Sequence, residues 1–505
     1  MAEVKNDDKL ERYHRLQQRL VDIYKDVFPD PLAPRTVVVI PSLTLDPREL
    51  AKITGAHHYE ERMLFLVMLL QMPQTQLIYV TSQPIPTSVI DYFLHLLPGI
   101  PSTHARRRLK LLACHDASPQ PLVQKILDRP RLIAKIRKGI TCPESAHISC
   151  FNSTDLEREL ALKLGIPLYA TNPDLKYLGY KGPGREIMTQ AGIQVPTGME
   201  HLGDENAMIT ALHHLKQDNP GLRKAVIKLN EGFSGEGNAV FSLADCPEEG
   251  IAEWITANLP EGIQFEAAGE TWARYCDKFR DMQGIVEEFV EGEEKRSPSV
   301  QCRINPVGEV QVISTHDQIL GGPSGQIFLG CTFPADPDYR VELQEAGRRV
   351  GEVLRDRGVI GRFGVDFVSV KQPDGWKHYA IEINLRKGGT THTFMMLKFI
   401  TNGEYDCDTG EFIIPGGESR CYFASDNVCS DSLKGLCPDD LIDIAVEHNL
   451  HFHSTIQQGV VFHLIGALSE FGKLGMVCIG DTPESAQAFH DQTLKALENA
   501  NRAML

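Results

Sequence analysis

One predicted strand carries polar side chains of the kind that bind a metal ion. In the segment YAIEINL (379–385), alternation places Glu382 and Asn384 on one face, and Arg386 follows just beyond. A second predicted strand, FGVDFVSV, brings Asp366 alongside if the two strands pair. Carboxylate and amide oxygens suit Mg²⁺, which binds few protein carboxylates together with substrate phosphates. Taken alone, an exposed polar face of an antiparallel sheet explains these residues better.

A glycine-rich segment follows another predicted strand. Lys228 lies near the end of KAVIKLN, and Gly232, Gly235 and Gly237 separate it from the strand NAVFSL. Glycines allow backbone N–H groups to turn toward phosphate oxygens, and a lysine supplies a mobile positive charge. The segment is neither a Walker A loop nor a Rossmann fingerprint, because no helix follows directly. By itself it indicates a phosphate site or a plain glycine-rich hairpin equally well.

A third segment, IVEEFVEGEE, is a short apolar strand interrupted by Glu287 and Glu288 and followed by Glu294. Such a strand can act as a hinge whose backbone pairs with adenine while a carboxylate binds ribose hydroxyl groups. A solvated sheet edge is the commoner explanation when the segment is considered alone.

The elements that must position these residues follow two different sequence patterns, one on each side of about residue 172. Up to about residue 172, the apolar runs RTVVVIPSL, QLIYVTS, RLKLLACHD and HISCFNS alternate with helical patterns, after an amphipathic helix at 7–28. This alternation predicts an α/β layer with a largely parallel sheet. No GxGxxG follows its first strand, so we expect a Rossmann-like domain without an assigned ligand. From Asn172 onward, a helix at REIMTQAGI and a long helix at VELQEAGRRVGEVLRDRG separate several further strands.

Composition narrows the function classes. The chain has 505 residues and a formal net charge of −16, which argues against nucleic acid as the main partner. Its twelve cysteines include no CxxC pair, which favours reduced thiols over a disulfide framework. The charged N-terminus lacks an apolar signal region, and no apolar stretch approaches the roughly 20 residues of a membrane span. We therefore expect a cytoplasmic protein that contacts neither membrane nor nucleic acid.

Glycine loop, acidic hinge and metal strands occur in an order, over residues 175–400, that resembles the ATP-grasp superfamily. The resemblance assigns the first ATP-binding lysine to Lys181, before the helix REIMTQAGIQVP, and the second to Lys228. It places the adenine hinge at Glu287 to Val290. The remaining ATP contacts that it implies are Ser234, Gly235, Gly237, Glu288 and the ribose carboxylate Glu294. The implied magnesium ligands are Asp366, Glu382 and Asn384, and Arg386 matches the arginine of ExNxR variants.

A closer resemblance covers nearly the whole chain. STHDQILGGPSGQIFLGCTFPA and EINLRKGGTTHTFMMLKF are similar to segments of the pheganomycin-type peptide ligases. The fold that this implies is α/β, with a Rossmann-like pre-ATP-grasp domain at 1–172 and a small ATP-grasp (lid) subdomain at 173–270. A large subdomain with the metal site follows at 271–400, and a small α+β C-terminal domain at 401–505. One departure is Leu229-Asn230, where many ATP-grasp proteins have proline.

The resemblance implies an ATP-dependent carboxylate–amine ligase that forms an amide bond through an acyl phosphate and releases ADP and phosphate. Lys181 and Lys228 would hold the ATP phosphates, one or two Mg²⁺ would bind the acidic strands, and Arg386 would be catalytic. His316, Asp317, Gly388 and Gly389 are candidate contacts for small amino-acid or peptide substrates. The alternatives are an ATP-grasp reaction ending on another nucleophile, or a non-catalytic ATP-binding regulatory module. A homodimer is a further option.

Overall fold

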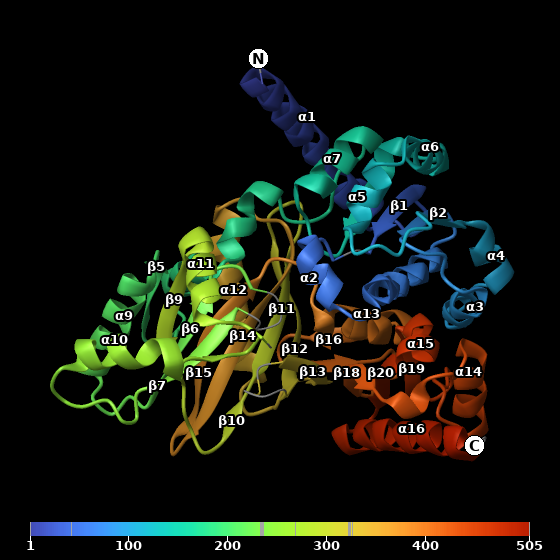
Figure 1. Ribbon diagram of the computed structural model, residues 1–505. Coiled ribbons are helices and arrows are strands. Elements are labelled where there is room, and N and C mark those ends of the chain that lie inside the picture. Colours follow the sequence, from blue (N-terminus) through green and yellow to red (C-terminus); the bar gives the residue numbers. More distant parts are fainter. Residues whose placement is uncertain are drawn as a thin grey trace.

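The computed structural model describes residues 2–41, 43–232, 237–267, 269–321, 325 and 327–503. Three larger sheets and a two-stranded ribbon organise this part of the chain, and Figure 1 shows them as adjoining parts of one molecule. The first sheet belongs to the N-terminal part, the second to a smaller unit beside it, and the third runs through the centre into the C-terminal part.

The N-terminal sheet is parallel, with strand order β3-β2-β1-β4, as the alternating pattern predicts. Its strands are β1 (Arg35–Ile40), β2 (Thr75–Thr81), β3 (Leu109–Ala113) and β4 (Ala146–Cys150). In β1, Val37 and Val39 enter one hydrophobic core, while Val38 and Ile40 enter the other. Because both faces are covered, the strand reads as a continuous apolar run.

The helical segments of this part precede, connect and cover the strands. They are α1 (Ala2–Asp22), η1 (Ile23–Val27), α2 (Pro47–Lys52), η2 (Ala56–Gln71), α3 (Thr87–His95), α4 (Ser102–Arg107), α5 (Leu122–Leu127), α6 (Pro130–Gly139), η3 (Pro143–Ser145) and α7 (Asp155–Leu164). The helix predicted at 7–28 is therefore present as α1 and η1 and begins nearer the N-terminus. The apolar segment that contains residues 63–72 forms most of η2, a 3-10 helix whose side chains are largely buried.

The second sheet is antiparallel, with order β5-β9-β6-β7-β8. It is preceded by η4 (Pro173–Gly179) and α8 (Lys181–Gln190). The unit built on this sheet comprises β5 (Gly198–Leu202), α9 (Glu205–Asp218), β6 (Lys224–Leu229), β7 (Asn238–Ser242), α10 (Ile251–Gly262), β8 (Gln264–Phe265), α11 (Trp272–Met282) and β9 (Gly284–Glu288). The predicted boundary at residue 270 falls inside this unit, because β9 pairs between β5 and β6.

The third sheet has nine strands in the order β10-β14-β11-β12-β13-β18-β20-β19, with β15 also paired to β14. The chain segment that forms its first strands comprises β10 (Lys295–Arg296), β11 (Pro298–Ile304), β12 (Val310–Gly321), β13 (Ile327–Phe333), α12 (Arg340–Asp356), β14 (Gly361–Gln372), β15 (Gly375–Asn384) and α13 (Gly389–Thr401). The long helix α12 packs its Leu343, Val350 and Leu354 into the core beneath β11 and β14.

The C-terminal part continues the same sheet. It comprises β16 (Glu404–Asp406), β17 (Glu411–Ile413), β18 (Cys421–Cys429), η5 (Asp431–Leu433), α14 (Pro438–Glu447), β19 (Gly459–His463), η6 (Ile465–Ala467), α15 (Leu468–Phe471), β20 (Lys473–Gly480) and α16 (Pro483–Ala503). Because β18 pairs with β13, hydrogen bonding crosses the predicted boundary at residue 400.

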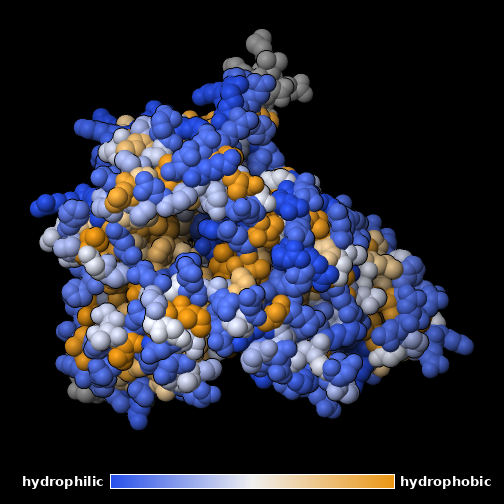
Figure 2. All heavy atoms as spheres, turned by 180° about the vertical axis from the view of Figure 1, so that it is seen from behind, coloured by the Kyte–Doolittle hydropathy of each residue, from blue (hydrophilic) through white to orange (hydrophobic). Residues whose placement is uncertain are grey.

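Figure 2 shows one face of the molecule, which is mostly hydrophilic. Apolar residues gather around a hollow in the middle of this face. No helix in the described residues has the length and apolar character needed to cross a membrane. Each of the twelve cysteines is a free thiol, as predicted.

Candidate active site

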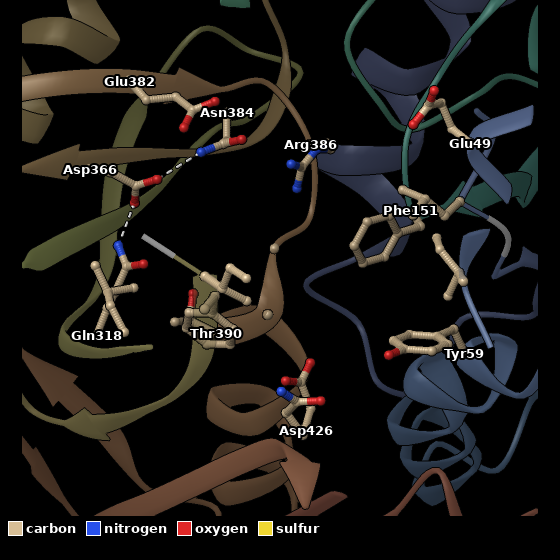
Figure 3. A pocket seen from close by; sticks show the side chains of 18 of the residues that line it. Glu49, Tyr59, Phe151, Gln318, Asp366, Glu382, Asn384, Arg386, Thr390 and Asp426 are labelled. Carbon is tan, nitrogen blue, oxygen red and sulfur yellow. Dashed lines mark hydrogen bonds between the residues drawn. The ribbon is translucent and has the colours of Figure 1, made fainter. Parts of the chain in front are cut away.

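A cavity of about 830 Å³ lies where the three larger sheets meet. Pockets of roughly 300–1,000 Å³ are the usual size for small-ligand sites. Eleven of the predicted site residues line it: Lys181, Lys228, Glu287, Glu288, Val290, Asp366, Glu382, Asn384, Arg386, Gly388 and Gly389. Figure 3 shows Asp366, Glu382 and Asn384 on one side, Glu49, Tyr59 and Phe151 of the N-terminal part on the other, and Arg386 between them.

The acidic residues are placed by the pairing of β14 with β15. Asp366 lies directly opposite Glu382, and Asn384 lies opposite Gly364, so their side chains share one face. Asn384 Nδ2 donates to Asp366 Oδ2 at 2.9 Å, and Gln318 Nε2 donates to Asp366 Oδ1 at 2.9 Å (Figure 3). The conditional expectation that the two strands pair is met.

The alternation predicted for β15 is interrupted in the middle of the strand. Asp366 pairs with Glu382 but Phe367 pairs with Ala380, so Ile381 is an extra residue in a β-bulge. Strict alternation along 379–385 would place Ala380 beside Glu382 and Ile381 in the core. Instead Ala380 is buried in the core with Ile383, and Ile381 lines the cavity. The bulge thus adds an apolar side chain beside the carboxylates.

Lys181 is held at this face from a different segment. Its Nζ lies 2.5 Å from Glu382 Oε1, and its side chain is only 10% exposed. Asn230 fixes the start of its helix, because Asn230 Oδ1 accepts a bond from the Gly182 N–H at 2.9 Å, and its carbonyl accepts from the Lys181 N–H. Asn230 Nδ2 also donates to the Met282 carbonyl at 3.1 Å. Asn230, noted as a departure from the family pattern, directly follows β6 and therefore links the start of α8 to the end of α11.

The second lysine is held by the acidic strand β9. Lys228 and Glu287 share a face of the β6–β9 pair, and Lys228 Nζ forms a buried ion pair with Glu287 Oε1. Arg185 Nη1 lies 2.8 Å from Glu287 Oε2, and Arg185 Nε lies 3.4 Å from Glu200. The backbone of Arg185 lies within α8. Its side chain and that of Glu287 position Lys228, which strand and helix patterns alone did not indicate.

Charge is unevenly balanced around the two carboxylates. Burial, followed by the nearby charge of Glu382, raises the pKa of Asp366 to about 7. Burial acts on Glu382 in the same direction, but the ammonium group of Lys181, then Arg386 and Lys228, outweigh it and lower the pKa of Glu382. The two neighbouring carboxylates therefore have pKa values that are shifted in opposite directions.

The donor set fits a magnesium ion bound together with phosphates. Among the described residues, no cluster of three or more His, Cys, Asp or Glu side chains has metal-binding geometry. Asp366 and Glu382 with the Asn384 amide supply two carboxylates and one neutral oxygen. That is the sparse oxygen set expected when substrate phosphates complete the coordination.

The end of β9 supplies the region predicted as an adenine hinge. Glu288 and Val290 line the cavity, together with Pro196, Val226 and Ile381. The Glu288 carboxylate accepts a bond from the Thr197 N–H at 2.9 Å. Lys295 also lines the cavity, and burial lowers its pKa. Strand and helix patterns did not single out Pro196, Val226 or Ile381, because ordinary apolar residues carry no sequence signal of a binding site.

Arg386 and the residues after it connect this face to the N-terminal part. Burial lowers the pKa of Arg386, whose Nη1 donates to the Lys387 carbonyl at 3.3 Å. Lys387 bonds back to the Cys150 carbonyl, and its N–H donates to the Phe151 carbonyl at 3.1 Å. Gly388 and Gly389 then place the start of α13 at the cavity. The catalytic candidate is therefore tied to the end of β4.

Several predicted residues lie elsewhere. His316 is fully buried with its Nε2 2.7 Å from the Tyr422 hydroxyl, and burial lowers its pKa to about 3. Asp317 accepts bonds from the Tyr339 hydroxyl and the Asp336 N–H. Neither residue lines the cavity, and the same holds for Glu294 and Gly237. Ser234 and Gly235 lie outside the described residues.

Comparisons with known proteins agree with this architecture. The family model described as "IQCH-like, ATP-grasp" matches residues 265–408, and that described as "PGM1 C-terminal domain" matches residues 440–493. The chain is 29% identical over 466 residues to an L-propargylglycine–L-glutamate ligase of Streptantibioticus cattleyicolor, covering 90% of this chain and 92% of that protein.

Two further similarities are more distant. The IQ motif-containing protein H of Danio rerio is 22% identical over 457 residues, which cover 81% of this chain but only 43% of that protein. The solved structure of a biotin carboxylase complex from Campylobacter jejuni superposes with a TM-score of 0.54 at 13% identity, covering 93% of this chain and 94% of that one. The predicted resemblance to the ATP-grasp superfamily and the predicted fold class are confirmed.

Proposed function

We propose that this ATP-grasp protein is an ATP-dependent carboxylate–amine ligase that joins two amino acids or short peptides through an amide bond. One observation carries the proposal. Lys181, Lys228, the pair Asp366–Glu382 and Arg386, from separate segments, converge on one cavity. The overall similarity to a ligase named for two amino acids supports the same conclusion.

The reaction has two balanced steps. An oxygen of the acyl substrate's carboxylate attacks the γ-phosphorus of ATP, the bond to the β-phosphate oxygen breaks, and ADP leaves. The neutral amine of the second substrate then attacks the acyl carbon, the carbon–oxygen bond to phosphate breaks, and the nitrogen loses one proton. The products are amide, ADP and phosphate. Such phosphoryl transfer depends mainly on positioning and on neutralising charge.

Each part of the cavity has a role in these steps. Lys181 and Lys228, already oriented by Glu382 and Glu287, hold phosphate oxygens. Asp366, Glu382 and Asn384 would hold a magnesium ion, which would supply positive charge to the phosphates of ATP. Arg386 stabilises negative charge on the acyl phosphate and on the tetrahedral intermediate.

The test is phosphate release from ATP and Mg²⁺ with pools of amino acids and short peptides, with product masses measured alongside. We expect release that requires a carboxylate and an amine, with a product mass short of one water. Arg386→Ala should lower turnover about 10²–10³-fold while retaining ATP binding. Glu382→Gln should lower both turnover and ATP binding, because it unpairs Lys181 and removes a metal ligand.

The control variant is Arg340→Gln. Arg340 is nearly as buried as the site residues, with a side chain 12% exposed and paired to Glu411 at 3.1 Å, but it does not line the cavity. Its turnover should match that of the unaltered chain. ATP binding without release from any pool, or equal turnover in all three variants, would contradict the ligase and favour a regulatory module.

Cytoplasmic location, small-molecule partners and a homodimer complete the proposal. The free cysteines support a reducing compartment. The dimer is tested by the mass of the native protein in solution.

A further inference from the structure

The cavity extends past the acidic strands to a second cationic side chain. Arg62, on η2, lines the cavity with a side chain that is only 14% exposed. Its guanidinium lies 4.0 Å from the centre of the Tyr59 ring, and its Nη2 lies 2.8 Å from Asp426 Oδ2 on β18. In Figure 3, Tyr59 and Asp426 lie at the end of the pocket away from Asp366 and Glu382, with Arg386 between the two ends.

Arg62 is held firmly but retains unused donors. The ring of Tyr59 and the carboxylate of Asp426 fix the plane of the guanidinium. Tyr59 is itself fixed through its hydroxyl, which accepts a bond from Lys473. Among the described residues, the only ion pair of Arg62 is the one between its Nη2 and Asp426. A guanidinium has five N–H donors in a fixed fork that matches a carboxylate, so a further anion completes its bonding.

Two separate cationic positions in one cavity match the needs of an amino-acid ligase. Arg62 and Arg386 both line this cavity, so the two guanidinium groups share one electrostatic environment. An amino acid that donates its amine still carries its own carboxylate. That carboxylate must be held apart from the metal face, because there it would compete for the γ-phosphoryl group.

We propose that Arg62 binds the α-carboxylate of the amine-donating amino acid and so directs its amine toward the acyl carbon beside Arg386. This inference rests on the proposed ligase function and names the class of its second substrate: an α-amino acid or peptide with a free carboxylate. Asp426 and Tyr59 act as positioning residues for Arg62. Phe151 and Tyr59 on the facing wall offer apolar surface to the substrate side chain (Figure 3).

The test compares an amino acid with its own α-amide, which lacks the carboxylate charge. The pair used is the amine donor with the highest turnover among the twenty amino acids, together with its amide. The unaltered chain should prefer the acid in kcat/KM by about 10- to 100-fold, the value of one charge-assisted hydrogen-bonded pair. Arg62→Gln should reduce this preference to within about threefold by raising KM for the acid, and Arg62→Lys should retain part of it.

Two controls separate this effect from misfolding. Arg340→Gln removes a similarly buried, ion-paired arginine outside the cavity and should keep the full preference for the acid. Arg62→Gln leaves the buried Asp426 unpaired, so the double variant R62Q/D426N is measured as well. It should lose the preference in the same way. A preference retained in both Arg62→Gln and the double variant, or a rise in KM for the acyl donor instead, would overturn the inference.

Hydroxylamine distinguishes failure of this inference from failure of the proposed function. It is a small neutral nucleophile without a carboxylate, and it converts an acyl phosphate into a hydroxamate. No hydroxamate from ATP and any carboxylate would refute the ligase itself. Hydroxamate formation with no turnover of any α-amino acid as amine donor would refute only the assignment of Arg62.

Discussion

The pairing of Glu287 with Lys228 leads to a quantitative prediction for Glu287→Gln. Glu287 is 2% exposed and bridges Lys228 and Arg185. In the variant, Arg185 keeps Glu200, whereas Lys228 has no other salt bridge among the described residues. Removing one partner of a buried ion pair costs about 3–5 kcal/mol, because a desolvated charge is left without compensation. We expect the free energy of unfolding of the unit built on β5 to β9 to fall by this amount.

The assay is urea unfolding followed by tryptophan fluorescence. Two of the three tryptophans, Trp254 and Trp272, pack against the core of this unit, so they report its transition. The midpoint should fall while the slope of the transition stays unchanged.

The matched control is Glu294→Gln. Glu294 and Arg296 are 51% and 53% exposed and lie 3.5 Å apart, so their pair contributes at most about 1 kcal/mol. High salt should weaken this control pair but not the buried one. A loss of less than about 1 kcal/mol in Glu287→Gln, or a loss equal to that of the control, would refute the assigned role of Glu287.

Two further predictions concern Asn230 and Glu60. Asn230→Ala should raise KM for ATP at least about tenfold in the phosphate-release assay, because the N–H of Gly182 and the carbonyl of Met282 lose their partner. Asn230→Asp keeps the acceptor, so its KM should lie between those of the unaltered chain and Asn230→Ala. An unchanged KM in Asn230→Ala would contradict the role of Asn230 in positioning the start of α8. Burial raises the pKa of Glu60 from 4.5 to about 7, so the folded state binds this proton more tightly and loses stability as the pH rises between those values. Glu60→Gln should therefore be more stable than the unaltered chain above pH 7, by up to about 3 kcal/mol, and should lose that advantage below pH 4.5. Unfolding curves measured across pH test this, and an advantage that does not depend on pH would contradict the raised pKa.

The sequence by itself determined the fold class and the location of the acidic strands. Continuous apolar runs such as that of β1 indicate a parallel sheet covered on both faces, because no polar face is left to show alternation. Glu382 and Asn384 are two residues apart on one strand, so local geometry alone places them on one face. The order of the three segments also predicted the ATP-grasp resemblance.

Tertiary structure decided which polar residues act together. Glu287 holds Lys228, and Asn230 ties the start of α8 to the end of α11. These contacts join residues far apart in sequence, and no local pattern encodes such distances. The bulge at Ile381 depends likewise on the register between β14 and β15, which one strand's alternation cannot reveal.

Arg62 and His316 show in opposite ways how tertiary structure decides which residues reach the site. In the sequence, Arg62 is a single basic residue in an apolar segment, and only the packing of η2 against β18 gives it an ion pair and a place in the cavity. His316 occurs in a glycine-rich segment that suggested substrate contact, but the sheet buries it against Tyr422. Residue type and spacing determine which chemistry is available, whereas burial and register determine which side chains reach the substrate. The latter two arise only when distant segments pack together.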